Sequence, residues 1–208
     1  SFERLKQSFL REHKIPGAAL AVARQGQLVY ARGFGYADVE RGEPVQPDSL
    51  FRIASISKPI TAAAVLQLVD RGKLQLNDRV CSIVSALPGL ACRADADPRL
   101  REITLEQVLQ HRGGWDREVS GDPMFRTLEI AAQLGIQPPV TARDIVRSML
   151  DQRLDFDPGE RYAYSNFGYC LLGRVIEQVA GTDYESYVRT ELLAPLGIRR
   201  MRVGHTLP

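Results

Sequence analysis

The sequence predicts an α/β protein of the α+β type, in which helices flank an antiparallel sheet and a mainly helical region follows. Residues 18–24 and 27–36 are rich in Val, Leu, Tyr and Phe, which is typical of strands. Only Gln25-Gly26 separates them, and this pair suits a tight hairpin. Further along, apolar residues recur mostly at helical spacing and form about seven candidate helices. A lone hairpin has two open edges, so either helices cover them or strands from elsewhere complete the sheet.

The composition is that of an ordinary globular protein. The chain has 208 residues, 44% hydrophobic and 25% charged, which suits one large domain or two small ones. A net charge of +2 leaves no electrostatic footprint for nucleic acid, and the group Arg199, Arg200 and Arg202 is expected to be solvated surface. No apolar run reaches the roughly 18–20 residues that span a bilayer. Composition therefore argues against nucleic-acid binding and a membrane span.

Local patterns predict the first elements. Residues 2–13 are typical of an amphipathic helix, which Ile15-Pro16-Gly17 ends. Gly33 and Gly35 in the second strand indicate twist or a close backbone approach. Residues 42–49 contain two prolines and are expected to form a turn-rich connection.

The next expected helix contains the apolar run 60–69. It is apolar nearly all round, so we expect it to be buried. Arg71-Gly72 should end it, with the glycine just past the last turn. A buried helix would be a rigid support for whatever lies at its start.

The remaining elements are mainly helical. Thr104 and Gln107 have the spacing of a capping box, and Thr141 is expected to cap a helix with the pairs Ile145/Met149 and Val146/Leu150. Other helices are expected over residues 78–87, near Leu128, and over 167–180 and 184–193.

Ser55 and Lys58 are the first candidate site residues. They lie three positions apart at the start of the apolar helix, so both can point into the same space. A cation in the first helical turn is disfavoured by the helix dipole, and broken local rules often mark function. Ser-x-x-Lys also occurs by chance about once in a chain of this size, so a chance match is the alternative.

Tyr164 and Asn166 form the second candidate group. Two residues apart on an extended segment, they would point the same way. A phenol beside a cation can relay protons, and a carboxamide can hold a substrate amide. The alternative is a buried tyrosine followed by an asparagine that caps the next helix.

Together these motifs resemble those of a known family. Ser55-Ile56-Ser57-Lys58 resembles the Ser-x-x-Lys motif of the penicillin-recognising serine enzymes. Tyr164-Ser165-Asn166 resembles the Tyr-x-Asn motif of their class C β-lactamase branch, which includes D-amino-acid carboxypeptidases and β-lactamase-like esterases. The flanking stretches 103–114 and 158–169 are similar as well, as are Leu171-Leu172-Gly173 and Pro195-Leu196-Gly197. The resemblance extends over residues 15–204.

The family's third motif, Lys-Thr-Gly or His-x-Gly on a later strand, has no counterpart here. After Asn166 the chain has no lysine, and its one histidine is His205. His111-Arg112-Gly113 fits His-x-Gly as letters but precedes Tyr164, and we interpret it as a local packing or turn segment. Arg202-Val203-Gly204 falls where the family has a connecting segment. The chain therefore resembles the first part of a longer family member.

The resemblance implies a β-lactamase/transpeptidase-like fold with its C-terminal sheet strands missing from this chain. Residues 1–74 would form the N-terminal part of the α/β domain: a helix, the hairpin and the nucleophile helix. Residues 75–208 would be a mainly helical region carrying the Tyr-x-Asn motif, and the two together an incomplete single unit. The absent part would supply the remaining strands, the third motif and one oxyanion-hole N–H.

For function, the resemblance implies a serine hydrolase without metal or cofactor. Ser55 would form an acyl-enzyme with a β-lactam, a D-Ala-D-Ala peptide or a small ester. Lys58 would accept its proton directly or through Tyr164, and Asn166 would orient the substrate. The Ser55 backbone N–H would be one oxyanion donor. The missing motif motivates the alternative of a non-catalytic ligand-binding or truncated relic of the same fold.

Three further expectations concern partners, compartment and thiols. Beyond a small-molecule or peptide substrate, open sheet edges could pair between copies of the chain. No signal peptide is visible, and the periplasmic or secreted location typical of the family is the only guide to compartment. Cys81, Cys92 and Cys170 have no metal spacing, and a Cys81–Cys92 pair is the less favoured of two possibilities.

Overall fold

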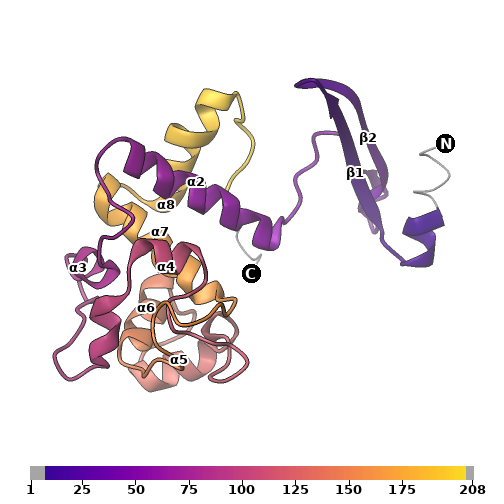
Figure 1. The fold of residues 1–208 in the computed structure, drawn as a ribbon. Coiled ribbons are helices and arrows are strands. Elements are labelled where there is room, and N and C mark those ends of the chain that lie inside the picture. The colour runs from indigo at the N-terminus through magenta and orange to yellow at the C-terminus, as the bar shows by residue number, and fades with distance from the viewer. Residues whose placement is uncertain (1–7, 205–208) are drawn as a thin grey trace. The chain divides into compact units, whose positions relative to one another are not determined.

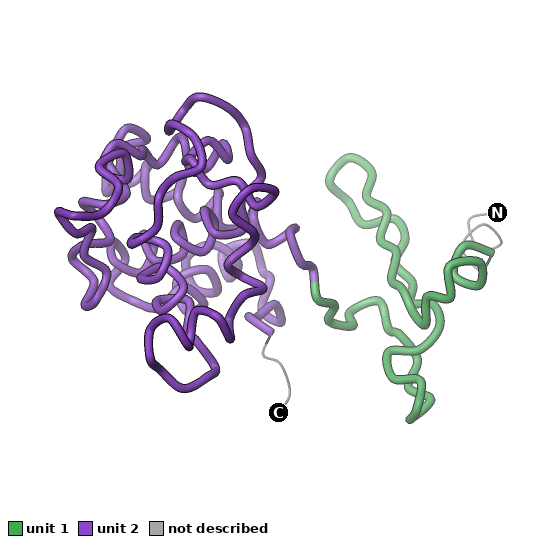
Figure 2. The backbone as a smooth tube through the Cα atoms, turned by 90° about the horizontal axis from the view of Figure 1, so that it is seen from below, with its two compact units in different colours: residues 1–52 green, residues 53–208 purple. Residues whose placement is uncertain are grey.

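A computed structural model of the chain describes residues 8–204. The chain divides into two compact units, Ser1–Arg52 and Ile53–Pro208, coloured green and purple in Figure 2. Residues 8–12 are helical, as expected for the end of the predicted first helix; residues 2–7 lie outside the described part. The division of the sequence at residue 74 stays a prediction.

The first unit contains a three-stranded antiparallel sheet in the order β1-β2-β3. Strands β1 (Gly17–Arg24) and β2 (Gln27–Asp38) confirm the predicted hairpin. Gln25 and Gly26 both have positive φ, 51° and 74°, as a two-residue turn between twisted strands requires. The sheet and the helices of the second unit together confirm the mixed α/β class (Figure 1).

Strand β3 (Glu43–Pro44) corrects the expectation that residues 42–49 form only a connection. It pairs with the end of β2, and its proline is tolerated because the strand lies at the sheet edge. The predicted close approach at Gly33 is confirmed, since a Cβ there would lie 1.9 Å from the carbonyl oxygen of Val45. A side chain at Gly33 would therefore push β2 away from this segment.

The second unit is helical. Its main helices are α2 (Ser57–Asp70), α3 (Val80–Val84), α4 (Leu105–Leu109), α5 (Thr127–Leu134), α6 (Ala142–Leu150), α7 (Asn166–Ala180) and α8 (Tyr184–Tyr187). Short 3-10 turns cover Ala54–Ile56, Pro98–Glu102, Pro123–Phe125 and Ala194–Leu196, and a π-helical turn covers Val188–Leu193. Among residues 8–204, none of the helices combines the length and apolar character needed to cross a membrane.

Helix α7 is the centre of this unit. It contacts α2, α3, α4, α6 and α8 (Figure 1). Its fully buried side chains are Phe167 at its start and Leu171, Leu172, Val175 and Ile176 further along. Burial of such residues contributes about 1.5–3 kcal/mol each relative to exposure. Because five helices pack against α7, its buried side chains form a common part of the core of this unit.

Side-chain caps fix the helix starts that the sequence predicts. Thr104 and Gln107 form a reciprocal capping box at α4, and Thr141 and Asp144 do so at α6. Gly181 ends α7 with a φ of 69°. Each capping side chain satisfies backbone N–H groups that the first helical turn leaves without partners.

Three expectations about this unit need correction. Helix α2 is not buried all round: Val65 and Leu68 are fully buried, but Leu66 is 45% exposed, so α2 buries one face in this unit. The helix expected over residues 78–87 covers only Val80–Val84. Cys81, within it, forms a disulfide with Cys92, the pairing that the sequence made the less favoured possibility.

Candidate active site

Ser55 lies on the 3-10 turn that leads into α2. The preceding residue, Ala54, has a φ of 44°, in the left-handed region that an L-residue with a Cβ enters at a cost of about 1 kcal/mol. Such strained residues cluster at functional sites, where the surrounding structure holds them in place. The Ser55 side chain is exposed in its unit, as an attacking hydroxyl must be.

Lys58 lies in the first turn of α2, on the same side as Ser55. Its Nζ donates a hydrogen bond to Ser55 Oγ over 3.2 Å. The ammonium also lies over the ring of Tyr164, 4.7 Å from the centroid, where the negative face of the ring attracts a cation. The side chains of Ser55 and Lys58 therefore share one space, as their spacing in the sequence predicts.

Tyr164 approaches the same hydroxyl from a segment distant in sequence. Its phenol oxygen lies 2.7 Å from Ser55 Oγ, and either oxygen can be the donor. The Lys58 ammonium and then the Ser55 hydroxyl lower the pKa of the Tyr164 phenol, and the guanidinium of Arg117 above its ring adds to this effect. A phenol with a lowered pKa is a better proton acceptor near neutral pH.

Asn166 is the first residue of α7, but it is not the cap. Ser165 caps the helix, with its Oγ accepting from the Gly168 N–H over 3.1 Å. The alternative in which Asn166 caps the next helix is therefore wrong. Its Oδ1 instead accepts from Lys58 Nζ over 2.6 Å, which links α2 to the start of α7.

Asp122 and Arg117 are site residues that the sequence reasoning missed. Asp122 Oδ2 accepts from Asn166 Nδ2 over 2.6 Å, while its Oδ1 caps the 3-10 turn at Met124 over 3.0 Å. Arg117 lies 5.1 Å from the Tyr164 ring centroid. The Asp122-Pro123 pair carries a turn-start signal, but nothing local in the sequence points to a partner 44 positions away.

His111 contacts the segment that carries Tyr164. Its Nδ1 accepts from the backbone N–H of Ser165 over 3.1 Å, and its ring packs against Tyr164 and Tyr169. Burial, and then the charge of Lys58, lowers the pKa of His111, which favours the neutral form that this contact requires. The structure places His111 in a packing and turn role, with a φ of 58°, as expected of that segment.

The arrangement joins one hydroxyl, one amine, one phenol and one carboxamide within hydrogen-bond distance. Within residues 8–204, no cluster of three or more His, Cys, Asp or Glu side chains could hold a metal ion. A serine hydroxyl in hydrogen-bond contact with an amine and a phenol is the kind of arrangement seen in nucleophilic serine sites. Residues 2–208 match the family model described as Beta-lactamase, so the chain belongs to the Beta-lactamase family.

Individual relatives agree with this assignment. Esterase EstB from Burkholderia gladioli is 36% identical over 199 residues, covering 91% of this chain and 47% of the relative. Penicillin-binding protein 4* from Bacillus subtilis is 30% identical over 194 residues, covering 92% of this chain and 39% of the relative. The chain thus spans about half, or less, of the length of these curated relatives.

Solved structures show the same β-lactamase/transpeptidase-like fold. EstCE1, described as a hydrolase with promiscuous acyltransferase activity, matches with a TM-score of 0.76 and 29% identity, over 95% of this chain and 51% of that one. The octameric penicillin-binding protein homologue from Pyrococcus abyssi matches with a TM-score of 0.72 and 30% identity, over 94% and 42%. The predicted family and fold class are confirmed.

Proposed function

We propose that the protein is a serine acyl-transfer hydrolase in which Ser55 is the nucleophile. The observation that carries the proposal is the position of Ser55 Oγ, 2.7 Å from the Tyr164 phenol and 3.2 Å from Lys58 Nζ. A serine hydroxyl is a weak nucleophile unless a neighbouring group takes its proton during attack. Relatives named as an esterase and a penicillin-binding protein support the same chemistry.

The chemical step is an acyl transfer in two halves. Ser55 Oγ attacks the substrate carbonyl carbon while its proton passes to Tyr164 or Lys58, and the same proton then goes to the leaving group as its bond to the carbonyl breaks. The acyl group stays on Ser55 as an ester. Water then attacks this ester and gives up a proton to the same acceptor. The acceptor passes that proton to Ser55 Oγ as the ester bond breaks, which releases the acid and the free serine.

Lys58 and Tyr164 have complementary parts in this proposal. Tyr164 makes the shorter contact with Ser55 Oγ, and the adjacent Lys58 ammonium favours its phenolate, so Tyr164 suits the role of direct proton acceptor. Lys58 is held by Asn166 and lies over the Tyr164 ring, where it balances the negative charge that develops. Proton transfer by a positioned group of this kind contributes about 10²–10⁴-fold to rate.

Asn166 is proposed to orient the substrate. One lone pair of Oδ1 and one N–H of Nδ2 are used within the protein. A carboxamide has a second lone pair and a second N–H, and these remain for a substrate amide or ester. The proposed substrates are β-lactams, D-Ala-D-Ala peptides and small esters, which all present a carbonyl to the serine.

The test is the intact mass of the complete gene product after exposure to a labelled penicillin and to an activated ester. We expect a covalent acyl adduct on the wild type and on Ser57→Ala, and none on Ser55→Ala. Ser57 is the matched control, because it is an exposed serine two residues away. Among the described residues, the Ser57 side chain makes no hydrogen bond to Lys58 or Tyr164.

Two results would overturn the proposal. One is the absence of both adduct and turnover with either reagent. The other is an adduct that persists in Ser55→Ala. Equal, reversible peptide binding by wild type and Ser55→Ala, without turnover, would favour the alternative of a non-catalytic binding protein.

A further inference from the structure

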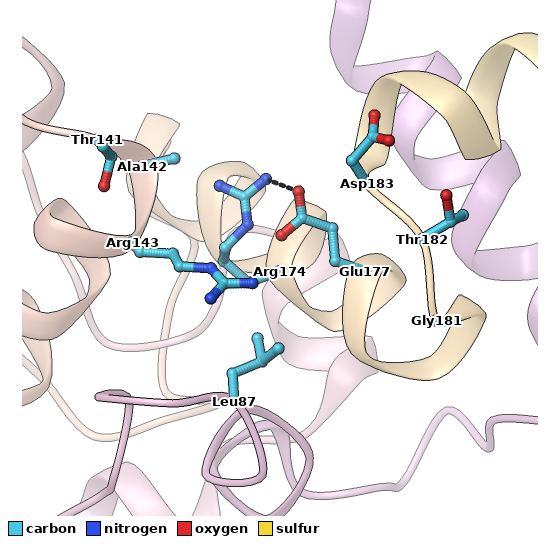
Figure 3. A pocket seen from close by; sticks show the side chains of 9 residues that line it. All are labelled: Leu87, Thr141, Ala142, Arg143, Arg174, Glu177, Gly181, Thr182 and Asp183. Carbon is cyan, nitrogen blue, oxygen red and sulfur yellow. Dashed lines mark hydrogen bonds and ion pairs between the residues drawn. The ribbon is translucent and has the colours of Figure 1, made fainter.

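His111 is a half-buried ionisable side chain on the turn that follows α4. Elsewhere in the helical unit, buried charges are balanced: the pocket drawn in Figure 3 is lined by two arginines and two carboxylates, and Arg174 there donates to Glu177 over 2.7 Å. Among residues 8–204, no carboxylate forms a hydrogen bond or an ion pair with the His111 ring. Its charge is therefore set by pH and by its surroundings, without a counter-ion.

His111 holds both neighbours of Tyr164. Its backbone carbonyl oxygen accepts from the Ala163 N–H over 2.9 Å, and its Nδ1 accepts from the Ser165 N–H over 3.1 Å. Ser165 is only 7% exposed, so its N–H needs a partner within the protein. These two bonds flank the residue whose phenol lies 2.7 Å from Ser55 Oγ. The position of that phenol therefore depends on His111.

Only one of the two bonds depends on the protonation of His111. The carbonyl oxygen accepts at any pH, whereas Nδ1 accepts only while the imidazole is neutral, with its proton on Nε2. In the imidazolium, Nδ1 carries a hydrogen that points at the Ser165 N–H. The bond is then lost, and a buried donor is left without its partner.

Three tyrosines and one lysine face the His111 ring. The rings of Tyr162 and Tyr164, from the segment before α7, lie with their centroids 5.6 and 4.7 Å from it, and that of Tyr169 of α7 lies 5.0 Å away. Lys58 of α2 lies over two of the same rings, 4.7 Å from the centroid of Tyr164 and 5.7 Å from that of Tyr169. The phenols are neutral in acid, so protonation of His111 adds a second positive charge to this cluster beside Lys58.

We propose that His111 is an acid-sensitive positioning residue for Ser55, an inference that rests on the proposed hydrolase function. While its imidazole is neutral, the bonds to Ala163 and Ser165 hold the Tyr164 phenol against Ser55 Oγ. Protonation breaks the Ser165 bond and places a charge beside Lys58, so the segment that carries Tyr164 shifts away from the nucleophile. His111 acts through Tyr164 and is not itself a proton acceptor in the reaction.

The first experiment is the pH profile of Ser55 acylation by an activated ester in the complete gene product. If only the Tyr164 phenol must lose a proton, the logarithm of the rate rises by about one for each pH unit below the phenol pKa. If His111 must be neutral as well, the slope should approach about two below the His111 pKa. Burial and the charge of Lys58 hold that pKa under its ordinary value of about 6.5, so the steeper slope should begin in mild acid.

His111→Asn is the decisive variant. The Oδ1 of an asparagine takes nearly the place of Nδ1, accepts at any pH and tolerates the φ of 58° found here. Acylation at pH 8 should stay within about tenfold of the wild type, and the slope in acid should stay near one. His111→Phe keeps a ring but no acceptor, so its acylation should be about tenfold or more below that of His111→Asn at every pH. His13→Asn is the matched control: His13 is an exposed histidine of the first unit, and this variant should keep the wild-type profile.

The second experiment needs no catalysis. NMR of the ¹⁵N-labelled complete gene product follows the His111 ring nitrogens and the Ser165 amide as the pH is lowered. We expect the neutral ring to carry its proton on Nε2, and the Ser165 amide to shift with the same pKa as the ring. In His111→Asn the Ser165 amide should not shift over this range.

The proposal fails if the Ser165 amide does not titrate with the His111 ring, or if the neutral ring carries its proton on Nδ1. It also fails if the acid slopes of the wild type and His111→Asn are equal. A wild type that is never acylated, but whose Ser165 amide titrates as expected, would overturn the proposed function and support the acid-sensitive contact.

Discussion

Asn166 donates a hydrogen bond from Nδ2 to Oδ2 of Asp122 over 2.6 Å. The two ends of a carboxamide are chemically different, so this bond fixes Nδ2 toward Asp122 and turns Oδ1 away from it. The carboxylate can only accept, so it selects the N–H end and leaves Oδ1 for Lys58. Asp122 thus positions Asn166, and through it the lysine ammonium.

Asp122→Ala should impair Ser55 acylation by about tenfold, the value of one hydrogen bond to a charged group. The asparagine could then turn its N–H end toward Lys58 and lose the contact at Oδ1. Asp122→Asn should cost less, because a carboxamide oxygen can still accept from Nδ2. Acylation rates with an activated ester measure both, with thermal unfolding as the control for folding. Equal rates in wild type and Asp122→Ala would contradict the positioning role.

Tyr164→Phe should lower the acylation rate roughly hundredfold or more, because the group nearest to Ser55 Oγ loses its oxygen. The pH profile gives a sharper test. The lowered pKa of the phenol means that the phenolate forms below its ordinary range, so the wild-type rate should rise with pH before pH 10. The variant should lack that rise. A variant profile that parallels the wild type would show that Tyr164 is not the base.

The Cys81–Cys92 bond should stabilise the helical unit. A disulfide that closes a loop with a sequence separation of 11 contributes about 2–3 kcal/mol by reducing the entropy of the unfolded chain. The double variant Cys81→Ala/Cys92→Ala should lose this amount in urea unfolding. Dithiothreitol should shift the wild-type midpoint downward and leave the double variant unchanged. An unaffected wild-type midpoint would argue against the pairing.

Asp97 should make stability depend on pH. Its carboxylate is 5% exposed and accepts from the Arg99 side chain and the Leu154 N–H. These contacts, with Arg99 first, hold the pKa of Asp97 well below its usual range. A carboxyl with a depressed folded-state pKa stabilises the fold above its unfolded pKa of about 4 and loses that contribution as pH falls.

At pH 7, Asp97→Asn should therefore unfold at a lower urea concentration, with a free energy of unfolding reduced by about 2 kcal/mol after allowing for the partly exposed Arg99. As the pH falls below 4, this variant should lose less stability than the wild type. Asp95→Asn is the control, because Asp95 pairs with Arg93 but is 68% exposed. The stability of this control variant, and its dependence on pH, should be nearly those of the wild type. Parallel pH curves for wild type and Asp97→Asn would contradict the assignment.

Local chemistry explains what the sequence could predict. Thr104 and Thr141 carry their capping partners three residues away, and Gln25-Gly26 can adopt the left-handed φ angles of its turn. Ser55 and Lys58 meet because one helical turn separates them. In each case the interacting atoms are close in sequence, so a short pattern contains the whole interaction.

The remainder depends on contacts distant in sequence. Asp122 meets Asn166 across 44 positions, and the spacing of Cys81 and Cys92 alone could not decide their pairing. Strand β3 has two residues, one of them proline, which is too short for any strand pattern. Leu66 belongs to a helix with apolar residues on every side, so periodicity could not show which face the unit leaves exposed.

Ser165 caps α7 between the two residues that reach Ser55 and Lys58. If the first turn of α7 frays, Tyr164 and Asn166 leave the site together, long before the core around Leu172 opens. Helix ends are among the first parts of a protein to open. The rate of Ser55 acylation would then report the local stability of that single turn. It would fall on heating while the bulk of the unit is still folded.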